Sequence, residues 1–464
     1  MYVTHLIEFT VNSTARWVRE CRVARVVSAH ALYSEGVLLP ESPVSGSKRA
    51  PDVSTRRAWK PARVGSPQVL MAGSAALDVS RNGLVVRGGS RFLATGTDCS
   101  DDDNFFTYDC SKAEKKAQED KGEEGQTLYK GSDNILASTF SRSGNYFALT
   151  DDNKRLILFS TKPWKCLSIR TVVRRCTALT FTATDEKILV ADKSGDVYSF
   201  SVLAPFQGGK LELGHLSMLL DVAMSPDDRY ILTADRDEKI RVSLFAAPHN
   251  IESFCLGHTE FVSRIFVVPN HPDLLLSTSG DCTLRLWEYK IGKELQCCHL
   301  NKLRNPETTQ CEKIFAVSRI TYCCRENYIA ILCDCIPVIY IFQLDDTKKQ
   351  LIYKQQLTFN YRVWDIAFEE TQGLWILQEC REMPVLLYHL ENGQWQPVSK
   401  NEVLKKISNN LHENWTMVEG GSPGMDDSFS SLYKTTFDNM TNYLKKKEER
   451  VQQQLEKKKR RKNP

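Results

Sequence analysis

His258 and Asp281 are the two side chains of this chain whose types most resemble a catalytic pair, because imidazole and carboxylate groups in contact can act as general acid and base. Each follows a glycine beside a short apolar stretch, and the second stretch closes on Trp287. In a repeat of short strands, His258, Ser277 or Ser279, Asp281 and Trp287 can form one buried chain of hydrogen bonds. We therefore interpret His258, Asp281 and Trp287 as structural residues rather than catalytic ones.

Glycine-rich motifs give no sign of catalysis either. A dinucleotide or methyl-donor site of the common kind needs a glycine-rich turn that opens a helix after a strand. The Gly-Gly pairs at 88–89, 208–209 and 420–421 do not have that setting, and the sequence has no P-loop, no Gly-x-Ser-x-Gly elbow and no His-Glu-x-x-His motif. We expect a protein that is not itself an enzyme and that needs no cofactor.

The cysteines do not indicate a metal site. Fifteen cysteines, an odd number, occur without a secretory leader, which favours a reduced intracellular compartment over a disulfide framework. Cys297-Cys298, Cys323-Cys324 and Cys333-x-Cys335 lack the paired spacing that a structural zinc site requires. We expect no bound metal.

The elements that carry His258 and Asp281 belong to a repeat. One copy opens at Gly257-His258 and closes on Trp287-Glu288, and the copy before it opens at Gly214-His215. The two histidines are 43 residues apart, within the period of about 40–45 residues of a four-stranded propeller blade. Alternating apolar runs between Asp, Gly and Pro turns are typical of short antiparallel strands.

Weaker copies extend the repeat on both sides. The Trp364-Asp365 pair falls where a first strand is expected, so it is not counted as a closing dipeptide. A first copy contains Gly83–Val86, Phe92–Thr95 and Phe105–Asp109, and the other weak copies span 135–159, 177–200, 319–342 and 364–388. The sequence therefore predicts an all-β fold, a seven-bladed WD-repeat β-propeller.

Charge is distributed unevenly along the chain. The net charge is +4, but residues 1–70 carry +5 and residues 445–462 carry +7, which leaves −8 for the remainder. An acidic body is a poor general surface for nucleic acid, because affinity for the phosphate backbone comes from cations. No stretch has the roughly 18 consecutive apolar residues of a membrane span.

The domain boundaries follow from these patterns. Residues 71–400 are predicted to form the propeller and 401–427 a linker. Residues 428–464 are predicted to form an amphipathic helix and a basic tail, because Phe429, Leu432, Tyr433, Phe437, Met440 and Leu444 recur at spacings of three and four. Residues 1–70 are expected to be a disordered or alternative amino-terminal extension before an ordinary start at Met71; Glu8 and Glu20 count against a transit peptide.

The basic tail allows three interpretations. Lys445, Lys446, Lys447 and Arg450 are followed by six consecutive cations at Lys457–Lys462. Such a segment is a solvated tail, a nuclear-import signal or an arm that contacts phosphates. We expect a nuclear location, with the cytoplasm left open, and these first four cations are our candidates for contact with RNA.

Charged turns mark one face of the predicted ring. The turns between second and third strands span Asp151–Arg155, Asp192–Asp196 and Asp235–Lys239 in neighbouring copies, and such turns emerge on the same face of a propeller. Turn chemistry explains their Asp, Asn and Gly residues. It does not demand the cations Lys193, Arg236, Lys239 and Arg241. The turns therefore predict a mixed-charge surface for a protein partner.

Several stretches are more specific than the generic repeat. They are Val85–Phe92, Ala191–Tyr198, Gly214–Val222, Thr233–Val242, Ser430–Lys434 and Phe437–Asn439. With them, the chain from Met71 to the tail resembles the WD-repeat, non-catalytic subunit of the eukaryotic tRNA guanine-7-methyltransferase. Residues 1–70 have no counterpart in this pattern.

The resemblance implies both a partner and a role. In that family, the propeller binds and steadies a separate methyltransferase subunit, which carries the methyl-donor site and modifies a guanosine in the variable loop of tRNA. It implies that Lys193, Arg236, Asp237, Lys239 and Arg241 face the catalytic subunit, which agrees with the charged turns. It also implies tRNA as a ligand of the complex.

Two other classes of protein share the propeller fold. Propellers that present substrates to a ubiquitin ligase tend to carry Trp-Asp-x-Arg after a third strand, whereas this chain has Trp287-Glu288-Tyr289-Lys290. A propeller hydrolase would need histidines and carboxylates that converge in the central channel. The ligase adaptor is the alternative function that we retain for comparison.

Overall fold

The computed structural model describes most of the predicted propeller and part of the carboxyl-terminal region. The described residues are 75–81, 83–95, 105–113, 132–303, 315–334, 336–370, 373–419, 429–434, 444, 447–450 and 452. The chain divides into two units, 1–65 and 66–464. The predicted amino-terminal extension, residues 1–70, lies outside the described residues.

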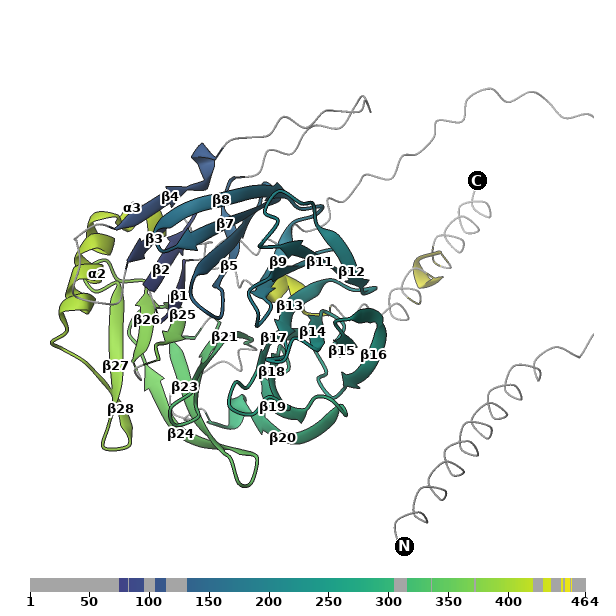
Figure 1. Ribbon diagram of the computed structural model, residues 1–464. Helices are drawn as coiled ribbons and strands as arrows, with labels where there is room; N and C mark the ends of the chain where they lie inside the picture. Colours follow the sequence, from purple (N-terminus) through teal and green to yellow (C-terminus); the bar gives the residue numbers. More distant parts are fainter. Residues whose placement is uncertain are drawn as a thin grey trace, which may run out of the picture. The chain divides into compact units, whose positions relative to one another are not determined.

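Seven four-stranded antiparallel sheets form the blades of a propeller, which confirms the predicted fold (Figure 1). Each blade is one continuous stretch of chain. Blades 1–4 contain β1–β4 (Ala76–Ser80, Gly83–Gly88, Arg91–Thr95, Phe106–Asp109), β5–β8 (Ile135–Phe140, Tyr146–Asp151, Arg155–Thr161, Trp164–Thr171), β9–β12 (Cys176–Phe181, Lys187–Asp192, Asp196–Ser201, Lys210–Gly214) and β13–β16 (Leu219–Met224, Tyr230–Asp235, Ile240–Leu244, Ala247–Cys255). Blades 5–7 contain β17–β20 (Val262–Val267, Leu274–Ser279, Thr283–Glu288, Lys293–His299), β21–β24 (Val317–Cys323, Tyr328–Cys333, Val338–Asp345, Gln350–Thr358) and β25–β28 (Val363–Phe368, Leu374–Gln378, Val385–Glu391, Gln394–Pro397).

The first strand of each blade faces the central channel, and the ring closes where β1 meets β25. At this seam the Leu77 amide donates to an Asp365 carboxylate oxygen at 2.9 Å. Arg319 of blade 6 bridges the same seam, with nitrogens 3.1 Å from Asp78 and 3.4 Å from Asp365. The channel ion pairs therefore tie the last two blades to the first.

Irregular pairing at the start of the inner strands sets which side chains enter this channel. The register shifts just before Asp221, Arg264 and Arg319. A bulge of this kind re-aims the side chain that follows it. These three residues line, with Asp78, a channel cavity of about 560 Å³. In this channel Arg319 pairs with Asp78, whereas Asp221 accepts from the Ile265 amide and Arg264 donates to Ser318 O.

The hydrophobic core lies between neighbouring blades. Trp287 is fully buried and packs in one cluster with Leu232 and Val242 of blade 4 and Ile265 of blade 5. Alternation along each strand places one set of side chains in each of the two contacts that a blade makes. Trp287 thus contributes to the contact between blades 4 and 5.

The predicted linker, residues 401–427, contains two helices. In α2 (Glu402–Glu413), the Asn401 side chain caps the first turn by accepting from the Leu404 amide, and α3 is Trp415–Glu419. Trp415 stacks on Trp364, with ring centroids 5.5 Å apart. The linker interpretation is wrong for 402–419, because buried side chains fix these helices against blades 7 and 1.

Only part of the predicted carboxyl-terminal helix falls within the described residues. Ser430–Leu432 form a single 3₁₀ turn, labelled η4, and Leu444, Lys447–Arg450 and Gln452 are helical. Phe437 and Met440 lie outside the described residues. No helix within the described parts of the chain is both long and apolar enough to cross a membrane.

Candidate functional site

His258 and Asp281 belong to the hydrogen-bonded chain expected for blade 5. His258 lies 3.0 Å from Asp281 through Nδ1 and 2.7 Å from Ser277 through Nε2, and Trp287 Nε1 donates to Ser277 at 2.7 Å. Ser277 is the serine that completes this chain. Burial lowers the pKa of His258 although Asp281 opposes that shift. All four side chains are engaged with one another inside the blade, an arrangement suited to structure.

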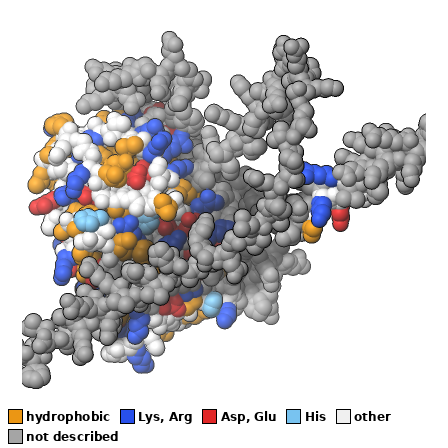
Figure 2. All heavy atoms as spheres, turned by 90° about the vertical axis from the view of Figure 1, so that its right-hand side faces the viewer, with side chains coloured by type: hydrophobic (Ala, Val, Ile, Leu, Met, Phe, Trp, Pro, Cys, Tyr) orange, Lys and Arg blue, Asp and Glu red, His pale blue; other side chains and the backbone are white. Residues whose placement is uncertain are grey.

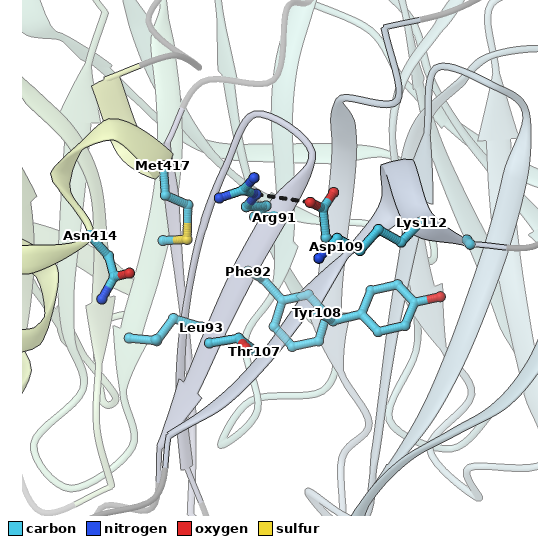
Figure 3. Close-up of a pocket in the computed structure, with 10 residues that line it drawn as sticks. Arg91, Phe92, Leu93, Thr107, Tyr108, Asp109, Lys112, Asn414 and Met417 are labelled. Carbon is cyan, nitrogen blue, oxygen red and sulfur yellow. Dashed lines mark hydrogen bonds and ion pairs between the residues drawn. The ribbon is translucent and has the colours of Figure 1, made fainter.

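A pocket of about 400 Å³ lies on the outer side of blade 1, beneath α3 (Figure 3). Arg91 and Asp109, on neighbouring strands of its lining, pair at 2.9 Å, while Met417 approaches from α3. Phe92 and Tyr108 stack at its base, with ring centroids 5.9 Å apart. The residues that line the pocket supply an ion pair and apolar surface. None of them is a nucleophile hydrogen-bonded to a general base.

Among the described residues, no group of three or more His, Cys, Asp or Glu side chains is placed to hold a metal ion. No two of the described cysteines are joined by a disulfide. The charged turns of the propeller form a separate candidate site.

The turns of blades 3 and 4 are joined by the loop between them. The His215 amide donates to Gly195 O at 2.8 Å, and the Arg236 amide donates to Met218 O at 2.9 Å. Gly195 has φ +99°, and a Cβ there would lie 2.6 Å from two carbonyl oxygens of the loop. The β10–β11 turn, the 215–218 loop and the β14–β15 turn consequently form one continuous surface, which we call the blade 3–4 surface.

The predicted partner residues occupy both sides of this surface. Lys193 is half-buried on the β10–β11 turn, where burial and then the charge of Arg175 lower its pKa. Asp237 and Lys239 are exposed on the β14–β15 turn. Arg236 is half-buried, and its Nε donates to Leu432 O at 3.3 Å. The structure thus brings Arg236, Asp237 and Lys239 together on one turn, with Lys193 on the neighbouring turn.

Arg241 supports the blade 3–4 surface from below. Its guanidinium donates to Gly214 O at 3.1 Å, Pro248 O at 2.9 Å and Ser243 Oγ at 2.8 Å. Partial burial lowers its pKa. Gly214 directly precedes the loop, so Arg241 holds the base of the loop in addition to any contact that it makes with a partner.

Apolar residues on the same face escaped the sequence analysis. Leu216 is fully exposed at the tip of the 215–218 loop, and Val173 and Leu256 are 57% and 61% exposed on the adjacent loops. Figure 2 shows hydrophobic, basic and acidic side chains interspersed on the surface turned toward the viewer. The sequence did contain a signal for this apolar surface. Leu216 stands in a short loop where turn chemistry favours Gly, Asn, Asp or Ser.

The predicted RNA-contacting residues are only partly described. Lys447 and Arg450 are exposed helical residues. Lys445 and Lys446 lie outside the described residues, as does the run Lys457–Lys462. The structure therefore shows two of the four proposed cations in contact with solvent.

Comparisons with known proteins agree on one family. The family model described as tRNA methyltransferase TRM82 WD40 domain matches residues 100–210 and 206–382. The chain is 68% identical over 376 residues to the Homo sapiens tRNA (guanine-N(7)-)-methyltransferase non-catalytic subunit WDR4, covering 81% of this chain and 91% of that protein. It is 67% identical over 375 residues to the Bos taurus protein of the same name, covering 81% and 90%.

A solved structure supports the fold alone. A chain from the crystal structure of a mitotic checkpoint complex superimposes with a TM-score of 0.52 at 12% identity, covering 66% of this chain and 86% of that one. At this identity, the likeness extends to the propeller architecture and carries no information about ligands.

Proposed function

The chain belongs to the family of WD-repeat non-catalytic subunits of tRNA (guanine-N(7)-)-methyltransferase, and from this premise we propose that it holds a separate catalytic subunit on the blade 3–4 surface and supports tRNA binding by the pair. Relatives at 67% and 68% identity are named as non-catalytic subunits. The protein is accordingly a scaffold and not itself the methyltransferase.

The observation that carries the proposed docking site is the composition of the blade 3–4 surface. The exposed pair Asp237 and Lys239 stands beside Leu216, whose side chain is fully in water. An apolar side chain that becomes buried, with charges at its rim, is the usual anatomy of a protein–protein interface. Leu216 supplies apolar area, and the charges set orientation and suppress incorrect partners.

Support for tRNA binding is proposed for the basic tail. The tail region 445–462 carries +7, whereas the body of the chain is acidic. Cations on a tail contact the phosphate backbone and position RNA without reading its bases. The same cations, together with Lys457–Lys462, also fit a nuclear-import signal, so we propose a nuclear location for the protein.

The ligase-adaptor alternative has little to support it. At the position where such adaptors carry arginine, this chain has Lys290, which pairs with Asp273 at 2.6 Å. Tyr289 beside it is buried. The family relationship also favours the methyltransferase complex.

The direct test is reconstitution. The purified chain is mixed with the catalytic subunit, and complex formation and 7-methylguanosine in tRNA are measured. We expect a stable complex, methylation by the pair, and no methylation by this chain alone. A catalytic subunit that neither binds this chain nor changes its tRNA methylation in its presence would overturn the proposal.

A further inference from the structure

The carboxyl-terminal segment Phe429–Lys434 is held against the propeller, far along the chain from the strands that it contacts. Phe429 is 4% exposed and Leu432 is fully buried, in a cluster with Leu220, Phe261 and Ala316. These three wall residues immediately precede, or begin, the inner strands of blades 4, 5 and 6. Figure 1 shows the η4 turn beside β13. The segment therefore covers this part of the channel rim.

Ring packing specifies how the segment sits. Phe429 stacks on Phe261, with ring centroids 5.8 Å apart, and Tyr433 meets the same ring edge-on at 5.0 Å. Gly280 leaves space for both rings, since a Cβ there would lie 2.6 Å from Phe261 and 3.0 Å from Tyr433. Aromatic contacts of this geometry add to the free energy gained by burial. The contact is thus shaped for these side chains.

The β14–β15 turn grips the same segment from the side. Arg236 Nε donates to Leu432 O, and Lys434 forms an ion pair with Glu238. Glu238 has φ +73°, a left-handed conformation within this turn. The turn that exposes Asp237 and Lys239 therefore also holds the segment Phe429–Lys434, which precedes the basic tail.

We propose that Phe429–Lys434 is an anchor whose function is to place the basic tail beside the blade 3–4 surface, so that the tail meets RNA bound by the docked catalytic subunit. This inference rests on the proposed function and adds positioning residues to it, namely Phe429, Leu432 and Tyr433. The ligand that the anchor serves is an RNA backbone, and the anchor itself does not touch it.

Chain length gives the size of the effect. Nine residues separate Lys434 from Leu444 in the sequence, whereas 24 separate Leu444 from Glu419, where α3 ends. Effective concentration falls roughly as the −3/2 power of tether length, so release of the anchor lowers it about fourfold. The tail then loses about fourfold in its contribution to RNA affinity.

The experiment is a double-mutant cycle on the full complex with tRNA. The anchor variant is Phe429→Ala with Leu432→Ala, Ser431→Ala is the control on the exposed side of the segment, and the tail variant replaces Lys445, Lys446, Lys447 and Arg450 with Ala. We expect the anchor variant to weaken tRNA binding about fourfold, and to have no further effect when the tail is already neutralised. Phe429→Leu, which keeps an apolar side chain, should restore most of the loss.

Each part of the argument has its own contradicting result. If neutralising the tail leaves tRNA affinity unchanged, the proposed tail contact is wrong and the anchor inference falls with it. If the tail variant weakens binding but the anchor variant does not, the anchor inference alone is wrong. An equal loss in both backgrounds would also overturn it, because the anchor would then act through the propeller rather than through the tail; affinity for the catalytic subunit, which should be unchanged, identifies that case.

Discussion

Blades 4 and 5 share one design and use it differently. In both, a histidine in the entry loop bonds a hydroxyl on the second strand: His215 reaches Thr233 at 2.8 Å, and His258 reaches Ser277 at 2.7 Å. The carboxylate partner differs in position. Blade 5 uses Asp281 in the turn, at 3.0 Å, whereas blade 4 uses Asp235 at the end of the strand, at 3.2 Å.

That shift of two residues frees position 237 in the turn of blade 4. In blade 5, Asp281 also accepts from the Thr283 and Thr259 amides, so the turn is occupied by its own scaffold. In blade 4, Asp237 stands at the corresponding place and is exposed. In blade 4 the carboxylate that pairs with the histidine lies outside the turn, which leaves Asp237 available to the proposed interface.

The largest effect should come from blade 5. Trp287 is fully buried between the two blades, so Trp287→Ala should lower the free energy of unfolding by about 3–5 kcal/mol. Chemical denaturation measures this loss. Trp287→Phe, which keeps most of the packing, should cost less. An unchanged denaturation midpoint for the alanine variant would show that this blade does not carry the core.

The next effect separates the two blades by function. Arg241 and Arg285 occupy matching places on the third strands; Arg285 pairs with Glu294 inside blade 5, and Arg241 supports the loop that carries Leu216. Arg241→Leu should weaken binding of the catalytic subunit by about 2 kcal/mol or more, and Arg285→Leu should leave it unchanged. Calorimetry measures both affinities, and equal losses would erase the distinction between the blades.

Acid should destabilise blade 5 through its histidine. Burial lowers the pKa of His258, and although burial alone would raise the pKa of Asp281, hydrogen bonds from His258 and Thr283 hold it below its usual value. Both groups therefore add stability that is lost as pH falls, and for His258 the loss begins below its unfolded pKa of about 6.5. Melting temperature should fall between pH 7 and pH 5, and it should fall less in His258→Gln. If wild type and His258→Gln lose melting temperature equally as pH falls, protonation of His258 does not contribute to the pH dependence of stability.

The smallest effect for each residue substituted is expected at the tail, which belongs to neither blade. Replacing Lys445, Lys446, Lys447 and Arg450 with Ala should weaken the binding of different tRNAs by a similar factor. It should also reduce the dependence of log affinity on log salt concentration. Filter binding at several salt concentrations measures the slope. An unchanged slope would favour a solvated tail or an import signal, and a loss for one tRNA only would indicate that the tail reads sequence or shape.

The blade count and the strands of the strong copies could be predicted because each repeat is local. Alternation, turn residues and the 43-residue period are all contained in one stretch of chain. The first strand of blade 1, Ala76–Ser80, was missed, because its five residues include two polar ones and give only a weak apolar alternation. The sequence also predicted that the charged turns share one face of the ring, because turns between second and third strands emerge on one side of a propeller.

Long-range contacts could not be predicted in this way. The spacing of Phe429, Leu432 and Tyr433 suits a helix, but their partner Phe261 lies in blade 5, and packing against it leaves a single 3₁₀ turn. The helices α2 and α3 were missed because their buried face matches Trp364 and blade 1, which a local pattern does not reveal. Arg241 was expected to face the catalytic subunit, yet its hydrogen bonds depend on where Gly214 and Pro248 lie in the folded chain.

The central claim is that the freed turn of blade 4 docks the catalytic subunit, and a charge exchange tests it most directly. Asp237→Lys with Lys239→Glu keeps the net charge of the turn while inverting the field toward a partner, and Lys354→Glu with Glu391→Lys makes the same exchange at exposed positions of blades 6 and 7. Calorimetry with the catalytic subunit should show binding weakened by about tenfold or more for the first pair and unchanged for the second. Wild-type affinity in the Asp237 and Lys239 variant, with the fold intact, would contradict the account.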